Sequence, residues 1–152
     1  MTAPSEHHRK LSALAGTWHG VEELSPSPWE APAGASKARV ESRLDLGGAF
    51  LITDYVVDRP DGTTFRGHGI HGWDETSQRY VMYWFDALSP GIVEPAFAKW
   101  DAGTLAFEKT TAQGHVRFVY EFEGETRYRF RIENSRDGRI WNPTMEGRYV
   151  RA

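Results

Sequence analysis

The sequence predicts an antiparallel all-β fold, a single meander β-barrel of about ten strands with one short N-terminal helix. Strand-like runs follow one another closely, and no helical run interrupts them after residue 24. The runs are separated by the turn signals Asp61-Gly62, Gly114, Gly124 and Asp137-Gly138. When these turns pair the runs, aromatic residues fall on one common face, as the lining of a barrel requires.

The expected elements follow from local composition. Residues 5–15 can form the helix, with Ser5 as N-cap and Gly16 as its end. Residues 25–36 are rich in Pro, Ser and Ala, so we expect a loop or flap over an opening, because Pro removes sheet donors. Strands are expected at Thr17–Leu24, Lys37–Leu46, Phe50–Asp58, Thr63–Trp73, Tyr80–Asp86, Ile92–Trp100 (weak), Thr104–Thr110, His115–Glu123, Thr126–Asn134 and Trp141–Val150.

Composition limits the possible classes of protein. With 152 residues and no second domain visible in the pattern, residues 1–152 are expected to form one domain. The absence of cysteine excludes disulfides, thiol catalysis and thiolate metal sites. The net charge of −3 and the lack of a basic block argue against a nucleic-acid partner. The polar start predicts neither signal peptide nor membrane segment, hence a cytoplasmic protein without a membrane partner; a homodimer is left open.

Two carboxylates, Asp54 and Asp86, are expected to face inward near Trp84. This follows if Asp61-Gly62 is a two-residue turn and residues 47–49 form a three-residue turn. A buried carboxylate is costly unless it is hydrogen-bonded or protonated, so either acid could orient a ligand or act as acid or base. A purely structural role is equally open, with Asp86 capping the next turn.

Glycines are expected opposite both acids. Gly69 lies opposite Asp54 in this register, and Gly67 lies opposite Asp86. Glycine weakens a strand unless something needs the room, so the pair predicts a hollow that forms the polar end of a cup. His71 is expected on the same inward face, as a core residue or as a third acid–base candidate.

The C-terminal strands are predicted to have one charged face and one aromatic face. Arg127, Arg129, Arg131 and Glu133 point to solvent in this register. The inward face is expected to hold Phe107, Val116, Phe118, Tyr120, Phe122, Tyr128, Phe130, Ile132, Trp141, Met145 and Tyr149. The expected ligand contacts are Ser42, Asp54, Gly67, Gly69, His71, Trp84, Asp86, Phe107, Tyr120, Tyr128 and Met145.

Other chemistry finds little support in the sequence. No Gly-x-Ser-x-Gly elbow is present, which argues against a serine hydrolase. A lone inward histidine is more often a core residue than a ligand, so we expect no metal site and no cofactor. Glu22 shares a face with Trp18 but is expected to lie beyond the barrel rim.

The segment Gly16-Thr17-Trp18-His19-Gly20 resembles the Gly-x-Trp opening of the calycin superfamily, which includes lipocalins, fatty-acid-binding proteins and nitrobindin-like proteins. In lipocalins this Trp packs at the closed end of the barrel against an Arg of the last strand. The resemblance therefore implies that Trp18 packs against Arg148 or Arg151, as a cation–π contact.

A second resemblance covers nearly the whole chain. The segments LAGTWHG, SPSPW, SRLDLGGAFLITDY, FRGHGIHGWDETSQRYVMYWFD and MEGRYVR are similar to the DUF1579 family of bacterial proteins. The family implies a lipocalin-like barrel and assigns no activity. Nitrobindin-like proteins bind haem through a histidine in the C-terminal part of the barrel, whereas the last histidine here is His115.

Three function classes follow. The first is the binding of a small apolar or aromatic molecule in the cup of the barrel. The second is a small enzyme of isomerase, cyclase or hydrolase type with Asp54, Asp86 or His71 as acid–base groups. The third is a haem-binding barrel.

Overall fold

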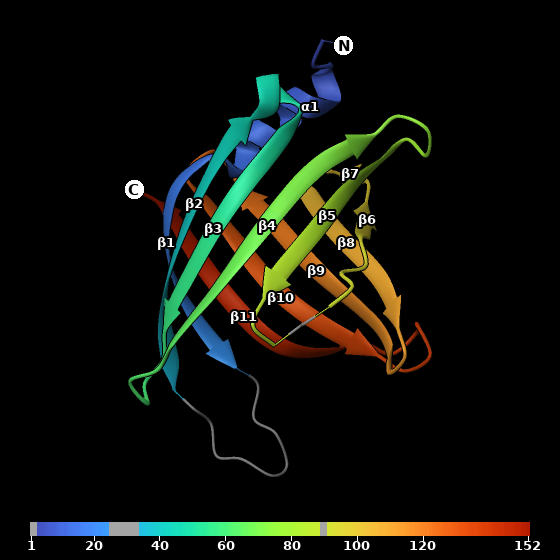
Figure 1. Ribbon diagram of the computed structural model, residues 1–152. Coiled ribbons are helices and arrows are strands. Elements are labelled where there is room, and N and C mark those ends of the chain that lie inside the picture. Colours follow the sequence, from blue (N-terminus) through green and yellow to red (C-terminus); the bar gives the residue numbers. More distant parts are fainter. Residues whose placement is uncertain (1–2, 25–33, 89–90) are drawn as a thin grey trace.

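The computed structural model describes residues 3–24, 34–88 and 91–152, and its strands form a closed antiparallel barrel (Figure 1). A short helix, α1 (Glu6–Lys10), continues into a 3₁₀ turn, η1 (Leu11–Leu14). The strands are β1 (Gly16–Leu24), β2 (Ala35–Asp45), β3 (Phe50–Asp58), β4 (Thr64–Asp74), β5 (Arg79–Asp86), β6 (Ala96–Ala98), β7 (Trp100–Asp101), β8 (Thr104–Thr111), β9 (Gly114–Glu123), β10 (Arg127–Ser135) and β11 (Asn142–Arg151). The predicted fold class is confirmed: among the described residues, ten of these strands form the closed wall, and β7 pairs with β8 alone and lies outside it.

Neighbouring strands of the wall are neighbours in the sequence, apart from two closing contacts. β1 pairs with β11, and β6 pairs with both β5 and β8. The contact between β6 and β8, called the seam below, is weak, because a single residue pair, Phe97 with Glu108, joins these two strands. In place of the one weak strand expected at Ile92–Trp100, the structure has two short strands, β6 and β7.

The N-terminal segment closes one end of the barrel, where α1 lies over the strands (Figure 1). Trp18 is 1% exposed, and its indole nitrogen donates to the carbonyl of Leu14 at 3.0 Å. The guanidinium of Arg151 lies 4.2 Å from the centre of the Trp18 ring, and it also donates to the carbonyls of Ala13 and Ala15. The cation–π contact predicted for Trp18 is confirmed, with Arg151 as the cation.

The register of β3 differs by one residue from the expectation, and this reverses its two faces. The first connection pairs Asp45 with Phe50, so it contains one residue more than predicted. The turn at Asp61-Gly62 also has an extra residue, because the amide of Arg59 donates to the carbonyl of Thr63 at 2.9 Å. Leu51, Thr53 and Val57 are consequently the buried residues of β3.

The other strand pairs keep the predicted faces. The pairing of β4 with β5 is as expected, with Gly69 opposite Trp84 and Gly67 opposite Asp86. In β8 to β11 the registers move by two residues, so that Tyr120 faces Phe130 rather than Tyr128. A shift of two residues preserves the face that a side chain occupies, because side chains alternate along a strand. The aromatic lining of β8 to β10 is therefore retained. Trp141 is an exception, because a bulge after Ile132 changes the register of β10 and β11 by one residue; its ring lies 4.0 Å from the guanidinium of Arg117 and does not line the cavity. Glu133, expected in solvent, is 6% exposed and is paired with Arg117 and Arg131.

The loop predicted at 25–36 lies largely outside the described residues. Its last two residues, Ala35 and Ser36, belong to β2, where Ser36 is buried. Residues 25–33, which carry the prolines, are not described.

Candidate functional site

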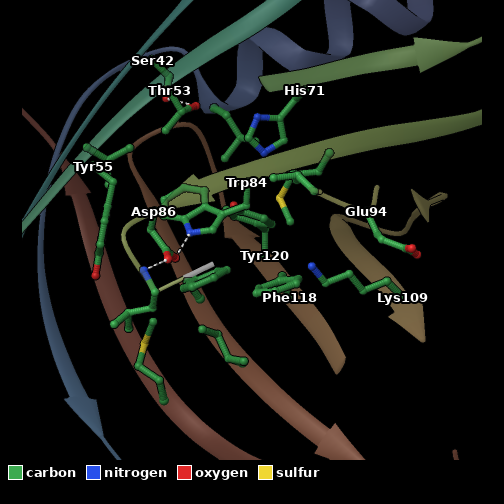
Figure 2. A pocket seen from close by; sticks show the side chains of 18 of the residues that line it. Ser42, Thr53, Tyr55, His71, Trp84, Asp86, Glu94, Lys109, Phe118 and Tyr120 are labelled. Carbon is green, nitrogen blue, oxygen red and sulfur yellow. Dashed lines mark hydrogen bonds between the residues drawn. The ribbon is translucent and has the colours of Figure 1, made fainter. Parts of the chain in front are cut away.

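A cavity of about 770 Å³ lies inside the barrel and extends from Leu14 of η1 to the connection after β5 (Figure 2). Its mouth lies between the connection after β5 and the end of β8, where Leu88, Ile92, Lys109 and Thr111 line it. The apolar and aromatic lining residues are Leu14, Val40, Phe65, Met82, Trp84, Val93, Phe118, Tyr120, Tyr128, Phe130, Ile132, Met145 and Tyr149. Such a volume with a mainly apolar wall is typical of a site for a small molecule.

His71 is the expected inward histidine, and the structure places it in the cavity wall. It is 1% exposed, and neither ring nitrogen has a hydrogen-bond partner among the described residues. The rings of Phe107 and Tyr120 meet it edge-on, at centroid distances of 5.5 and 6.3 Å. Burial lowers the pKa of His71 to about 4, because an imidazolium is poorly solvated there, and the nearby backbone of Leu51 opposes this shift only in part. His71 is thus a neutral imidazole with unused hydrogen-bonding capacity.

Tyr120 and Tyr128 supply two phenols to the same wall. Burial raises the pKa of both hydroxyls, so both are protonated donors. Within the described ranges, no side-chain or backbone group hydrogen-bonds either hydroxyl. Together with His71, these residues give an aromatic cavity a few polar groups without protein partners.

Three other polar side chains of the cavity wall, Ser42, Thr53 and Asp86, are already paired. The hydroxyls of Ser42 and Thr53 lie 2.9 Å apart. The carboxylate of Asp86 accepts a hydrogen bond from the Trp84 indole at 2.8 Å and another from the backbone amide of Leu88 at 2.8 Å. Asp86 therefore ends β5 and caps the following turn, while it also lines the cavity.

The expectation that Asp54 faces inward is wrong. The side chain of Asp54 is 44% exposed on the outer face, 2.8 Å from His68 and 3.5 Å from Arg43. Its place on the inner face is taken by Thr53, which is 7% exposed. The extra residue in each flanking turn causes the exchange. The sequence held a signal for this, because inward Asp54 would share its face with Asp58, and charged groups are costly inside a barrel.

The hollow expected above Gly67 and Gly69 is also absent from the described structure. A Cβ atom added to Gly67 would lie 2.2 Å from the Trp84 ring, and one added to Gly69 would lie 3.2 Å from it. The glycines therefore make room for the indole of Trp84, not for a ligand. Phe107 is fully buried beside the cavity and is not among its lining residues.

Glu22 is a buried carboxyl group on the inner face of β1, although the sequence placed it beyond the rim. It is 5% exposed, and it accepts hydrogen bonds from Tyr55, at 2.5 Å, and from Tyr149. Desolvation raises the pKa of Glu22, against the effect of the two phenols. The alternation of β1 contained the signal, because Trp18, Gly20 and Glu22 share one face.

Lys109 is a second residue that the sequence reasoning missed. Leu105 and Phe107 are buried on the inner face of β8, and strand alternation places Lys109 on the same face. Its ammonium lies 5.9 Å from the centre of the Phe118 ring, inside the mouth of the cavity (Figure 2). Across the described residues it forms no ion pair within 4.0 Å.

In residues 3–24, 34–88 and 91–152, no group of three or more His, Asp or Glu side chains could hold a metal ion. No helix in these ranges has the length and apolar character needed to cross a bilayer.

Comparison with protein families assigns the chain. The profile of the family described as "Protein of unknown function (DUF1579)" matches residues 3–151. The chain therefore belongs to the DUF1579 family, as its sequence segments suggested. No curated protein sequence is significantly similar to it.

Solved structures share the fold at low sequence identity. Rv2717c from M. tuberculosis superposes with a TM-score of 0.70 at 13% identity, covering 97% of this chain and 98% of that one. A barrel named EF1p2_mFAP2b, solved bound to DFHBI, gives a TM-score of 0.51 at 13% identity and covers 95% and 98% of the two chains. At such identities the likeness concerns the fold alone.

Proposed function

We propose that this protein binds a small apolar or aromatic molecule inside its barrel. The observation that carries the proposal is the cavity of about 770 Å³, which the described residues leave unfilled. Protein interiors are normally packed to the density of organic crystals, so a void of this size is not needed for folding. Its volume lies within the range of about 300–1,000 Å³ that is usual for ligand sites.

The polar groups of the wall suggest how the ligand is oriented. Neither ring nitrogen of His71 has a hydrogen-bond partner among the described residues, and leaving a buried polar group unpaired costs about 1–3 kcal/mol. A ligand group that bonds to either of them recovers part of this cost. The proposed contacts are Ser42, His71, Trp84, Asp86, Tyr120, Tyr128 and Met145, all of which line the cavity.

The comparison with mFAP2b supports the proposal at the level of the fold. That barrel was solved bound to DFHBI and has the same overall path over 95% of this chain. A barrel of this size can therefore hold a small molecule. The chemistry of the ligand has to come from the lining of this chain.

The test uses N-phenyl-1-naphthylamine, an uncharged aromatic probe whose fluorescence rises in apolar surroundings. Titration of the protein should give saturable binding with one site per chain. Met145→Trp places a larger side chain in the cavity from β11. It should weaken binding at least about tenfold, because the indole occupies volume that the probe needs. Val150→Trp adds the same side chain to the exposed face of β11 and is the matched control.

Equal affinity in both variants would show that the probe binds elsewhere, and the proposal would then be wrong. Circular dichroism of both variants is needed to establish that each is folded. A loss of binding in Met145→Trp alone, with an unchanged strand spectrum, supports the cavity as the site.

The two alternative functions both depend on His71. In the enzyme alternative it is the acid–base candidate that lines the cavity without a partner, whereas Asp54 lies outside and Asp86 is capped. In the haem alternative it is the imidazole that would hold the iron. Titration with haem, followed by absorbance, separates haem from the other two functions: a Soret shift that is lost in His71→Phe would favour haem.

A further inference from the structure

We propose that the ligand carries an anionic group and that Lys109 binds this group at the mouth of the cavity. This inference rests on the proposed binding function and names the chemical class of the ligand, an apolar or aromatic body with a carboxylate, sulfonate or similar anion. Its starting point is a lysine on the inner face of a barrel strand.

The position of Lys109 is unusual for its residue type. It follows Leu105 and Phe107 on the inner face of β8, and these two residues are fully buried. Lysine on such a face normally turns its ammonium to water or to a carboxylate. Here the ammonium lies 5.9 Å from the centre of the Phe118 ring, which is part of the cavity wall. Figure 2 shows the side chain reaching toward Phe118 with the ammonium at its end.

The nearby carboxylates do not neutralise this charge. Glu94 also lines the mouth, but it is exposed and lies more than 4.0 Å from the ammonium. Asp86 is engaged by the Trp84 indole and by the amide of Leu88. Glu22 is bonded to Tyr55 and Tyr149. Among the described residues, Lys109 is the cationic side chain that lines the cavity and has no counter-ion.

The outer surface next to the mouth has the same sign. A groove along the seam between β6 and β8 is lined by Arg79, Lys99 and Lys109, and its carboxylate, Glu108, is paired with Arg117. Lys109 and Thr110 line both this groove and the cavity. A cationic approach on a chain with net charge −3 attracts anions to the mouth.

The deeper part of the cavity suits the uncharged body of such a ligand. His71 is neutral above about pH 4, and the other polar groups there are uncharged, the phenols and the paired hydroxyls of Ser42 and Thr53. A charge would be poorly solvated at that depth, so the anion belongs at the mouth, where Lys109 lies. The arrangement fixes the direction in which an amphipathic ligand enters.

Two probes that differ by one anionic group test the inference. N-Phenyl-1-naphthylamine is uncharged, and 8-anilinonaphthalene-1-sulfonate has the same aromatic body with a sulfonate. Lys109→Met keeps the length of the stem and removes the charge. It should weaken sulfonate binding roughly three- to tenfold and leave the affinity for the uncharged probe within about twofold, as for a half-exposed ion pair.

Control variants locate the effect. Lys109→Arg keeps the charge and should retain the preference for the sulfonate. Lys37→Met removes an exposed charge from β2 and should change neither affinity. The sulfonate affinity of the unmodified protein should fall with salt, and this dependence should be weaker in Lys109→Met.

The outcomes separate this inference from the proposed function. Suppose that the uncharged probe binds and that Met145→Trp weakens its binding. If Lys109→Met then changes the affinity for both probes equally, or for neither probe, the anion assignment is wrong while the binding function stands. If neither probe responds to Met145→Trp, the proposed function itself is wrong, and the inference falls with it.

Discussion

At the scale of single residues, His71 couples the cavity to the acid stability of the barrel. Burial lowers its pKa from 6.5 to about 4, so the unfolded chain takes up a proton at a higher pH than the folded one. Stability should therefore be full above about pH 6.5 and should fall as the pH drops toward 4. The loss attributable to this residue is about 3 kcal/mol.

The variant His71→Phe should remove this part of the acid sensitivity. Urea unfolding at pH 7 and at pH 5 measures the difference in free energy between the two conditions, which should shrink by about 2 kcal/mol relative to the unmodified protein. His68→Phe, at an exposed position of the same strand, is the matched control and should leave the difference unchanged. An equal effect of both substitutions would contradict the assignment.

Glu22 acts in the opposite direction. Desolvation raises its pKa, so the folded state holds its proton to a higher pH than the unfolded chain does. The stability contributed by the protonated carboxyl is present below about pH 4.5 and is lost as the pH rises through the raised value. Glu22→Gln keeps an acceptor for Tyr55 and Tyr149 and cannot ionise.

The free energy of unfolding of Glu22→Gln, relative to the unmodified protein, should consequently increase between pH 5 and pH 8. Urea titrations at both values give this comparison. Tyr55→Phe, which removes one donor, should cost about 1 kcal/mol. A relative stability of Glu22→Gln that declines with pH would show that the carboxylate is stabilised, not disfavoured, in the fold.

At the scale of elements, the face on which a side chain lies was predicted correctly wherever the predicted register was wrong by an even number of residues. The C-terminal registers differ from the expectation by two residues, so Tyr120 and Tyr128 still face the cavity. Both connections of β3 differ by one residue, so Asp54 and Thr53 exchange faces. A dipeptide such as Asp61-Gly62 identifies a turn, but it does not state how many residues the turn contains.

The partners of the cavity groups could be predicted only in part. Alternation alone places His71 and Met145 inward, because it depends on sequence spacing. The position of the Trp84 ring over Gly67 depends on a rotamer and on packing across two strands, which no spacing rule contains. The hollow was therefore placed at the glycines, whereas the cavity lies on the other side of the indole.

The N-terminal segment is an element whose docking can be measured. Trp18 is buried between η1 and the barrel, with its indole bonded to Leu14 and its ring against Arg151. Trp18→Ala should cost about 3–5 kcal/mol in the free energy of unfolding, because a large buried aromatic is lost and a cavity remains. Urea denaturation gives the value, and a loss below about 1 kcal/mol would mean that the closed end contributes little.

The seam between β6 and β8 is the closing contact of the barrel with few backbone pairs. β6 pairs with β5 over three residues and with β8 through one pair, whereas β3 and β4 pair over nine residues. Local opening should thus be easier at the seam. Hydrogen–deuterium exchange should show the amides of Ala96–Ala98 exchanging at least about tenfold faster than those of β3, and equal protection would contradict a weak seam.

For the whole molecule, the cavity is continuous with the packed core. Leu11, Trp18 and Leu51 are 0–1% exposed and belong to the core cluster, and Leu14 belongs to the same cluster and also lines the cavity. His71 pairs with Leu51 across β3 and β4 and lines the cavity as well. A ligand should therefore stabilise the barrel by filling the space that the core leaves between these residues.

The size of that stabilisation follows from linkage. A ligand that binds only the folded state at about 100 times its Kd adds about 2.7 kcal/mol, which raises the Tm of a chain of this length by roughly 5–10 °C. Differential scanning fluorimetry with an extrinsic dye would interfere with an aromatic probe, so calorimetry is the suitable measurement with N-phenyl-1-naphthylamine. The rise should be present in Val150→Trp and lost in Met145→Trp, because only the second substitution fills the cavity. A rise of equal size in both variants would mean that the probe stabilises the protein from a surface site.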